Sequence, residues 1–291
     1  MNPWTATSPC TVSACVTRTG TRPPARRTLR RAAAFARVVT RAMASGERIA
    51  DPEVLRASAR SALDALGVRL ETDGARLGVR AAPPAPGAPE PGTLVVANHI
   101  SWLDVVALLA VEPVTVLAKR EIAGWPVVGP VVRRAGTRFI DRDSLRSLPG
   151  TVGELAALLR TGRSVMVFPE GVTRCSGTGG RFRRAVFEAA LDAGAPVRPV
   201  TVGYRQHGVP STVAAFVGED DFGASLRRVL AADGLTVRLR AHNPVLPVPG
   251  VDDRRSLAER AQRAVRAADP AGAGPRLVRE RPRTVPRERA G

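Results

Sequence analysis

A histidine and a carboxylate lie five residues apart at the point where a strand is expected to end. Residues 94–97 read Leu-Val-Val-Ala, a run typical of a buried strand, and Asn98 and His99 follow directly. Asp104 falls in the first turn of an apolar helical segment, 102–110. Histidine accepts protons near neutral pH, and a carboxylate on its other ring nitrogen orients the ring and stabilises its charged form. The spacing therefore predicts a general base, His99, supported by Asp104.

The same stretch has a second interpretation. Ser101-Trp-Leu-Asp104 fits a capping box, in which Ser101 is the N-cap and Asp104 closes the first helical turn. Under this interpretation Asp104 only starts the helix, His99 is a loop residue, and Ser101 is a cap rather than a nucleophile.

Strands and helices alternate from residue 93 onward, as in βαβ units. We expect an α/β fold with a largely parallel central sheet flanked by helices, preceded by an N-terminal helical hairpin. The strands are predicted at 68–70, 94–97, 114–118, 137–140, 164–168, 197–204, 212–217 and 235–239. The helices between most of them are predicted at 102–110, 127–134, 152–160, 183–193 and 222–231.

Further chemical groups follow other predicted strands. Asp141 and Arg142 come after one of them, and Pro169-Glu170-Gly171 after another, followed by a Gly- and Arg-rich loop over 175–184. Since parallel strands bring their carboxyl ends to one edge of the sheet, we expect these groups to gather near His99. Two simpler interpretations remain open, that Arg142 is a surface residue beside Asp141 and that Glu170 is a turn residue before Gly171.

Four segments, in this order, resemble the conserved blocks of the glycerolipid acyltransferase family, which includes the lysophosphatidic acid acyltransferases. The resemblance covers residues 90–205, and more loosely 50–240. It implies a glycerol-phosphate acyltransferase-like fold. The blocks are Asn98-His99-x4-Asp104, Gly136-x2-Phe139-Ile140-x-Arg142, Phe168-Pro169-Glu170-Gly171 and Val197-x-Pro199-Val200.

The resemblance also implies a role for individual residues. His99 would deprotonate the acceptor hydroxyl, Asp104 would orient His99, and the alkoxide would attack an acyl thioester directly. Arg142 would hold the phosphate of the acceptor, for which a bidentate guanidinium is well suited. Glu170 and Gly171 would shape the acceptor site, and Pro199 would help to wall the acyl groove. The full set of expected substrate-binding residues is Asn98, Gly136, Phe139, Arg142, Glu170, Gly171, Arg174 and Pro199.

One departure from the family pattern concerns the acceptor. Many relatives continue the third block as Glu-Gly-Thr-Arg, whereas Gly171 is followed here by Val172-Thr173-Arg174. Either Arg174 binds the phosphate from one residue further on, or an arginine of the following loop does so (Arg181, Arg183 or Arg184). We expect an O-acyltransferase that converts 1-acylglycerol 3-phosphate to phosphatidic acid. The alternative acceptor is another lysolipid, such as lyso-ornithine lipid.

The expected co-substrate is an acyl thioester of coenzyme A or acyl carrier protein, with no other cofactor. Cys10, Cys15 and Cys175 lack companions at metal-ligand spacing, so no metal site is predicted and Cys175 is interpreted as having no role. His207 and His242 are interpreted as structural or surface residues.

The net charge of +18 favours partners that carry phosphate. A basic nucleic-acid-binding protein is the alternative from another class, but aromatic residues make up only 4% and do not alternate with the arginines, so bases would find no stacking platform. No specific nucleic-acid partner is expected.

The predicted domain limits are a disordered leader (1–28), an amphipathic helical hairpin (29–67), the acyltransferase α/β domain (68–249), and a C-terminal helix with a disordered basic tail (250–291). The first hairpin helix carries Arg30, Arg37 and Arg41 opposite Phe35, Val39 and Met43. No run of 18 apolar residues exists. We therefore expect a peripheral protein at the cytoplasmic face of the cell membrane, bound to anionic lipid by this helix. The alternative is that the helix packs on the main domain with its arginines in water.

Overall fold

The computed structural model describes residues 8–17, 23–74, 76–78, 90–125, 128–141, 145–175 and 180–267. Arg142, most of the Pro-rich connector before residue 93, and the tail from Asp269 lie outside these residues.

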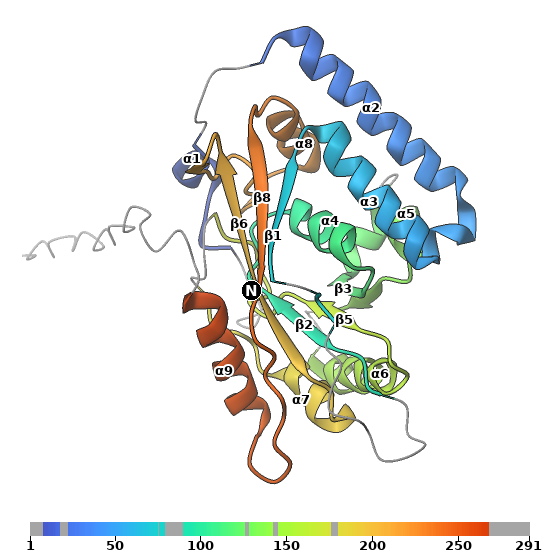
Figure 1. Cartoon of the computed structure of the whole chain (residues 1–291), viewed down its shortest axis with the longest axis vertical. Coiled ribbons are helices and arrows are strands. Elements are labelled where there is room, and N and C mark those ends of the chain that lie inside the picture. The colour runs from blue at the N-terminus through green and yellow to red at the C-terminus, as the bar shows by residue number, and fades with distance from the viewer. Residues whose placement is uncertain are drawn as a thin grey trace, which may run out of the picture.

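Within the described residues, eight strands form one mixed sheet (Figure 1). Its order is β1-β8-β6-β2-β5-β3-β4, and β7 pairs with β6. From β6 to β4 the neighbouring strands are parallel, whereas β8 is antiparallel to β6. The expectation of a largely parallel sheet is confirmed. The bounds are β1 (Arg69–Asp73), β2 (Leu94–Ala97), β3 (Thr115–Lys119), β4 (Arg138–Ile140), β5 (Val165–Val167), β6 (Val197–Gln206), β7 (Val209–Pro210) and β8 (Leu235–Ala241).

Helices cover both faces of the sheet, and each face has its own apolar core. Helices α3, α4 and α8 contribute to the first core, whereas α6, α7 and α9 contribute to the second. In Figure 1, α2 and α3 lie side by side at one end of the molecule and α9 lies at the other. The α-helices are α1 (Val12–Cys15), α2 (Ala25–Ala44), α3 (Pro52–Leu66), α4 (Trp102–Val111), α5 (Val128–Arg134), α6 (Leu148–Arg160), α7 (Ala185–Ala193), α8 (Phe222–Leu230) and α9 (Arg254–Ala267), and short 3-10 helices are η1 (Gly46–Ala50), η2 (Arg120–Gly124) and η3 (Leu145–Ser147).

One predicted strand is wrong. Residues 212–217 are buried for the most part but form no strand. The carbonyls of Val213 and Ala215 accept hydrogen bonds from the Arg228 side chain, at 3.2 and 2.7 Å, instead of from a neighbouring strand. An arginine from α8 thus satisfies backbone groups that a sheet would otherwise satisfy.

The hairpin helices pack on the sheet domain and on each other. The Asp51 side chain caps α3 by accepting hydrogen bonds from two backbone N–H groups, as its position before Pro52 predicts. Gly67 ends α3 with φ +72°, and a Cβ there would meet the Arg31 guanidinium of α2. The left-handed turn therefore favours glycine, and a larger residue would also displace the Arg31 side chain.

The apolar face of α2 packs on the domain. The Phe35 ring lies 6.4 Å from that of Trp102 in α4, centroid to centroid, and Phe35 packs against the first core. This corrects the expectation that Phe35 faces lipid: Phe35 follows the second alternative, of a docked helix. Met43 and Leu29 remain exposed, as do Arg30 and Arg37.

Two predicted domain limits also need correction. Within the expected disordered leader, Val12–Cys15 form α1, Cys10 and Cys15 are buried in the first core, and α2 begins at Ala25. The C-terminal helix α9 is part of the sheet domain, because Leu257 and Val265 are fully buried in the second core.

Candidate active site

His99 and Asp104 meet beyond the carboxyl end of β2. His99 Nδ1 lies 2.8 Å from Asp104 Oδ2, and the side chain of Asp104 is fully buried while that of His99 is 19% exposed. The same Oδ2 accepts hydrogen bonds from the backbone N–H groups of Ile100, at 2.7 Å, and Ser101, at 2.9 Å. With the proton on Nδ1 directed to the carboxylate, Nε2 is the ring nitrogen left to accept a proton.

The contacts that the two interpretations predict for Asp104 are both present. Ser101 and Asp104 form the complete capping box at the start of α4, and Asp104 also bonds to His99. The cap therefore fixes the carboxylate, and the carboxylate fixes the imidazole. The first turn of α4 therefore sets the position of the His99 ring through Asp104.

Tyr204, the single tyrosine of the chain, is a site residue that the sequence did not identify. Its hydroxyl donates to Asp104 Oδ1 at 2.6 Å. Burial and the nearby carboxylate raise the pKa of Tyr204 well above its usual range, so the hydroxyl stays protonated and remains a donor. Alternation along β6 predicts that Tyr204 is buried on one sheet face, but nothing in the sequence points from it to a residue 100 positions away.

Phe168 covers one face of the His99 ring. The two rings are stacked, with centroids 3.9 Å apart and planes 13° apart. The contact follows from the sheet order, because β5, which ends just before Phe168, is the neighbour of β2. The stack restricts the ring to one orientation and shields it from water on that side.

Asn98 has a structural role. Its amide nitrogen donates to the Val202 carbonyl at 2.9 Å, and its oxygen accepts from the Val202 N–H at 2.8 Å. The side chain is fully buried. Asn98 was expected to bind substrate, but both polar groups of its side chain are committed to joining the end of β2 to β6.

The buried Glu170 and the partly exposed Arg174 form an ion pair beside His99. Arg174 Nε lies 3.2 Å from Glu170 Oε2, without the alignment of a hydrogen bond, and the Arg174 backbone N–H donates to the His99 carbonyl at 2.8 Å. Burial raises the pKa of the Glu170 carboxyl, and the charge of Arg174 acts in the opposite direction. Glu170 is thus more than a turn residue, and Arg174 is partly neutralised before any ligand arrives.

The loop after Glu170 places a different arginine at the turn. Gly171 has φ +76°, and a Cβ there would lie 3.0 Å from Arg183 Nε. The Arg183 backbone N–H donates to the Pro169 carbonyl at 2.9 Å, and the residue is exposed. No carboxylate within the described residues pairs with the Arg183 guanidinium. Arg183 is therefore an exposed loop arginine beside Gly171 that has no carboxylate partner among the described residues.

The second block lies further away along the sheet. Gly136 lies in the turn after α5 with φ +79°, and Phe139 is a partly buried residue of β4. Because β4 is the third strand from β2, its end lies about 14 Å from the end of β2. Arg142, which follows β4 in the sequence, lies outside the described residues.

Pro199 lies inside the sheet. It is buried in β6 opposite Val96 of β2, and its carbonyl accepts a hydrogen bond from the His242 N–H. Val197, two positions before it and on the same side of the strand, packs in the second core, whereas Tyr204 packs in the first. Pro199 therefore faces the second core, on the side of the sheet away from Tyr204. The expected role of Pro199 in an acyl groove stays a prediction.

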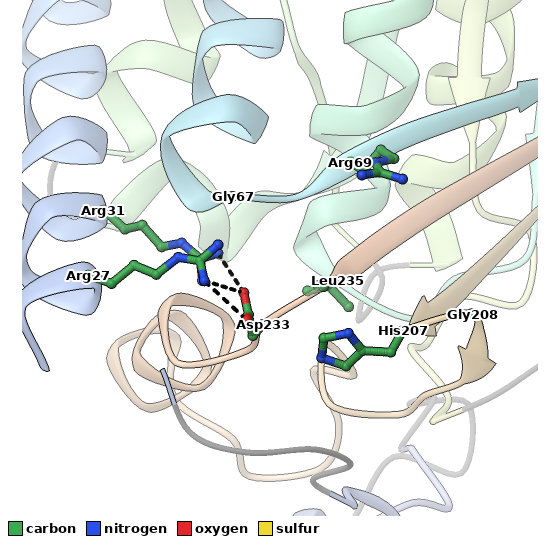
Figure 2. A pocket seen from close by; sticks show the side chains of 9 residues that line it. Arg27, Arg31, Gly67, Arg69, His207, Gly208, Asp233 and Leu235 are labelled. Carbon is green, nitrogen blue, oxygen red and sulfur yellow. Dashed lines mark hydrogen bonds and ion pairs between the residues drawn. The ribbon is translucent and has the colours of Figure 1, made fainter. Parts of the chain in front are cut away.

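A cavity of about 390 Å³ lies away from this site (Figure 2). It is bounded by Arg27 and Arg31 of α2, by His207 after β6 and by Asp233 before β8. Arg31 donates to the carbonyls of Leu230 and Ala232, and both arginines pair with Asp233. Since β6 runs six residues beyond the end of β2, the cavity lies about 20 Å from that end. Its polar contacts serve to dock α2.

The thiols are the second group that sequence reasoning missed. The Sγ atoms of Cys10, Cys15 and Cys175 lie within 4.8 Å of one another. Spacing along the chain gave no companion to Cys175, because its partners are about 165 residues distant. The expectation that Cys175 has no partner is wrong.

Comparison with known proteins identifies the family. Residues 80–203 match the Acyltransferase family model. A lyso-ornithine lipid O-acyltransferase of Pseudomonas aeruginosa is 40% identical over 182 residues, which are 62% of this chain and 69% of the relative. A 1-acyl-sn-glycerol-3-phosphate acyltransferase of Neisseria meningitidis is 35% identical over 192 residues, 66% of this chain and 74% of the relative. The chain belongs to the glycerolipid acyltransferase family.

The fold comparison agrees with this assignment. The crystal structure of the 1-acyl-sn-glycerophosphate (LPA) acyltransferase PlsC from Thermotoga maritima has a TM-score of 0.55 and 20% identity, covering 82% of this chain and 92% of that chain. The family match, 80–203, contains all four sequence blocks, including His99 and Asp104. In this glycerolipid acyltransferase the paired side chains of His99 and Asp104 therefore lie within the matched segment, beyond the carboxyl end of β2.

Proposed function

We propose that this acyltransferase transfers a fatty acyl group to the free hydroxyl of 1-acylglycerol 3-phosphate, giving phosphatidic acid. The donor is an acyl thioester of coenzyme A or acyl carrier protein, and no further cofactor enters the proposal. The observation that carries it is the 2.8 Å contact between His99 Nδ1 and Asp104 Oδ2, with Asp104 held by three further donors.

The reaction follows from this arrangement. His99 Nε2 takes the proton of the acceptor hydroxyl, and the oxygen attacks the thioester carbonyl. The tetrahedral intermediate then collapses, the C–S bond breaks, and the imidazolium returns its proton to the thiolate. Asp104 stabilises the imidazolium in between. Proton transfer by a positioned base contributes about 10²–10⁴-fold to the rate, so positioning of the two substrates must supply the rest.

The charge beside Gly171 favours a phosphate-bearing acceptor. Arg183 is exposed next to the turn and has no carboxylate partner within the described residues, whereas Arg174 is already paired with Glu170. A guanidinium in this state suits a phosphate, to which it can donate two hydrogen bonds. We therefore assign phosphate binding to Arg183, together with Arg142 as the family resemblance implies.

A lyso-ornithine lipid is the second candidate acceptor. It is supported by the 40% identity with the Pseudomonas aeruginosa relative, which exceeds the 35% identity with the Neisseria meningitidis relative. It is also supported by the displaced Arg174, whose charge is offset by Glu170.

An acceptor panel tests the proposal. The purified protein is given a labelled acyl thioester with lysophosphatidate, lyso-ornithine lipid or another lysolipid, and the products are identified by mass spectrometry. We expect phosphatidic acid as the main product. His99→Ala should lower the rate at least about 100-fold, since a general base contributes that much, and Asp104→Asn should retain a small residual activity. A His99→Ala rate above about a tenth of wild type contradicts the base assignment.

Arginine variants test the acceptor headgroup. Arg183→Ala and Arg142→Ala should each raise the KM for lysophosphatidate with little change in the donor KM. Arg142→Lys should restore only part of the loss, because the bidentate fork is missing. Arg263→Ala, an exposed position on α9, is the matched control. Acylation of lyso-ornithine lipid but not of lysophosphatidate would transfer the assignment to the second acceptor.

We further propose that the protein works as a peripheral enzyme at the cytoplasmic face of the membrane. Within the described residues, no helix is long and apolar enough to cross a membrane. The exposed side of α2 carries arginines, which suits an anionic surface.

A further inference from the structure

Three thiols from opposite parts of the chain converge beside the active-site loop. Cys10 and Cys15 belong to the N-terminal segment around α1, and Cys175 follows directly on Arg174. The Cys10 and Cys175 sulfurs are 3.5 Å apart, and all three sulfurs lie within 4.8 Å of one another. Cys10 and Cys15 are buried and Cys175 is partly buried.

The segment that carries Cys10 and Cys15 is fastened at both ends. Ser8 Oγ donates to the Thr173 carbonyl at 2.8 Å, two residues before Cys175. The Thr17 N–H donates to Thr212 Oγ1 at 2.9 Å. Between these points Thr11 caps α1 by accepting from the Ala14 N–H. The thiols are thus presented by a segment whose position is set by other contacts.

The sulfur distances suit metal coordination better than a disulfide. In a tetrahedral zinc–thiolate site with bonds of about 2.3 Å, the sulfurs are about 3.8 Å apart. A disulfide needs about 2.05 Å and uses only two of the three sulfurs. We propose that Cys10, Cys15 and Cys175 form a binding site for a thiophilic metal ion, of which Zn²⁺ is the representative. Thiolates select such ions.

Metal binding releases protons from the three thiols. Each thiol releases its proton to solvent as a metal–sulfur bond forms, so three thiols become three thiolate ligands. Within the described residues, the group contains no fourth cysteine, histidine or carboxylate, which leaves one coordination position for water or another small ligand.

The proposed metal site lies next to the loop that contacts His99. Cys175 adjoins Arg174, whose backbone N–H bonds to the His99 carbonyl. A metal ion would therefore tie the N-terminal segment to the stretch that lines the active site. This site is independent of the proposed acceptor and donor.

Metal titration tests the proposal. The full-length protein is purified under reducing conditions, stripped with a chelator, and titrated with Co²⁺ and then Zn²⁺. We expect one Co²⁺ per chain, with the thiolate-to-cobalt charge-transfer absorption, displaced by one Zn²⁺. Cys15→Ser and Cys175→Ser should each weaken binding at least about 100-fold, since even outer-sphere partners of a metal site contribute up to that factor. Ser13→Ala, an exposed position on the same helix, should bind as wild type does.

A second measurement uses only the wild-type protein, so that it remains informative if the variants fail to fold. Zn²⁺ should protect all three thiols of the wild-type protein from alkylation, as counted by mass spectrometry. Reduced, folded wild-type protein that takes up no Co²⁺ or Zn²⁺ would overturn the proposal. So would serine variants with unchanged affinity, or a protein that, when reduced, leaves its thiols equally reactive with and without Zn²⁺.

Discussion

Asp104 uses both carboxylate oxygens for positioning. Oδ2 serves His99 and two backbone N–H groups, and Oδ1 accepts from Tyr204. A fully buried carboxylate is stable as an anion only when several donors surround it. These hydrogen bonds therefore keep the Asp104 carboxylate ionised and hold it in one position. The contact with this carboxylate then sets the orientation of the His99 ring.

Tyr204→Phe tests the contribution of the fourth donor. The ring keeps its volume, but Asp104 Oδ1 loses its donor, so we expect a loss of about 1.5–3 kcal/mol in the free energy of unfolding. The rate kcat should fall about tenfold, which corresponds to about 1.4 kcal/mol in the barrier. Urea denaturation and steady-state kinetics measure these effects.

Thr201→Val is the matched control in the same strand. Thr201 Oγ1 donates to the Val265 carbonyl at 2.8 Å on the other side of the sheet. This change should lower stability by a similar amount and leave kcat nearly unchanged. If both variants lower kcat equally, the effect of Tyr204→Phe comes from lost stability and not from the lost donor to Asp104.

The residues that sequence reasoning identified are those with local partners. His99, Ser101 and Asp104 lie within six positions, so their spacing alone predicts both the base and the cap. Tyr204 and the Cys10–Cys175 contact join positions 100 and 165 residues apart, which only the folded sheet brings together. No periodicity encodes such contacts.

At the scale of elements, α9 connects the second core to the active-site loop. Its residues Leu257 and Val265 are fully buried, and its side chains Gln262 and Arg266 both donate to the Gly180 carbonyl. Gly180 in turn packs over the Glu170–Arg174 pair. The helix therefore supports the loop that carries Arg183.

Leu257→Ala is expected to cost about 2–5 kcal/mol in the free energy of unfolding, because it opens a cavity in the second core. Val251→Ala is the control: that side chain is 78% exposed, and its loss should change stability by less than about 0.5 kcal/mol. Urea denaturation compares the two. Equal small losses would mean that α9 is separate from the core of the sheet domain, as the predicted domain limit at residue 250 implied.

The sequence predicts elements well where capping and breaking residues mark them. Helix α3 is an example: Asp51 caps its start directly before Pro52, and the left-handed Gly67 ends it, as these residue types predict. Residues 212–217 have the apolar pattern of a strand but bond to Arg228, a long-range side-chain contact that overrides the pattern. The role of α9 was missed because its burial depends on the second face of a sheet that is assembled from distant strands.

At the scale of the whole molecule, part of the net charge of +18 is concentrated on one surface, the outer side of α2. With Phe35 packed inward, the outer side of α2 presents Arg30, Arg37 and Arg41, and Leu29 is 69% exposed on the same helix. The contacts of Arg27 and Arg31 with Asp233 hold this helix to the domain. Attachment through α2 would therefore rest mainly on charge, and deleting the helix would also uncover the first core.

Charge reversal on α2 is a better test of membrane attachment than deletion. The triple variant Arg30→Glu, Arg37→Glu, Arg41→Glu keeps the docked face intact. Each basic residue near an anionic surface contributes about 1 kcal/mol, so we expect vesicle binding to weaken at least about 100-fold. Turnover of vesicle-borne acceptor should fall with it, while turnover of detergent-dispersed acceptor survives. Co-sedimentation with anionic vesicles and the two activity assays measure this.

The control must change the net charge equally at another face. Arg254→Glu, Arg255→Glu, Arg263→Glu reverses three exposed arginines on α9, which lies at the opposite end of the molecule from α2 (Figure 1). If attachment is directed through α2, this variant should retain most of the vesicle binding, and high salt should weaken the wild type as the α2 reversal does, because exposed charges are screened over about 10 Å or less. Equal losses in both triple variants would show that the membrane responds to net charge alone, and an α2 variant that binds as fully as wild type would place the contact on another face.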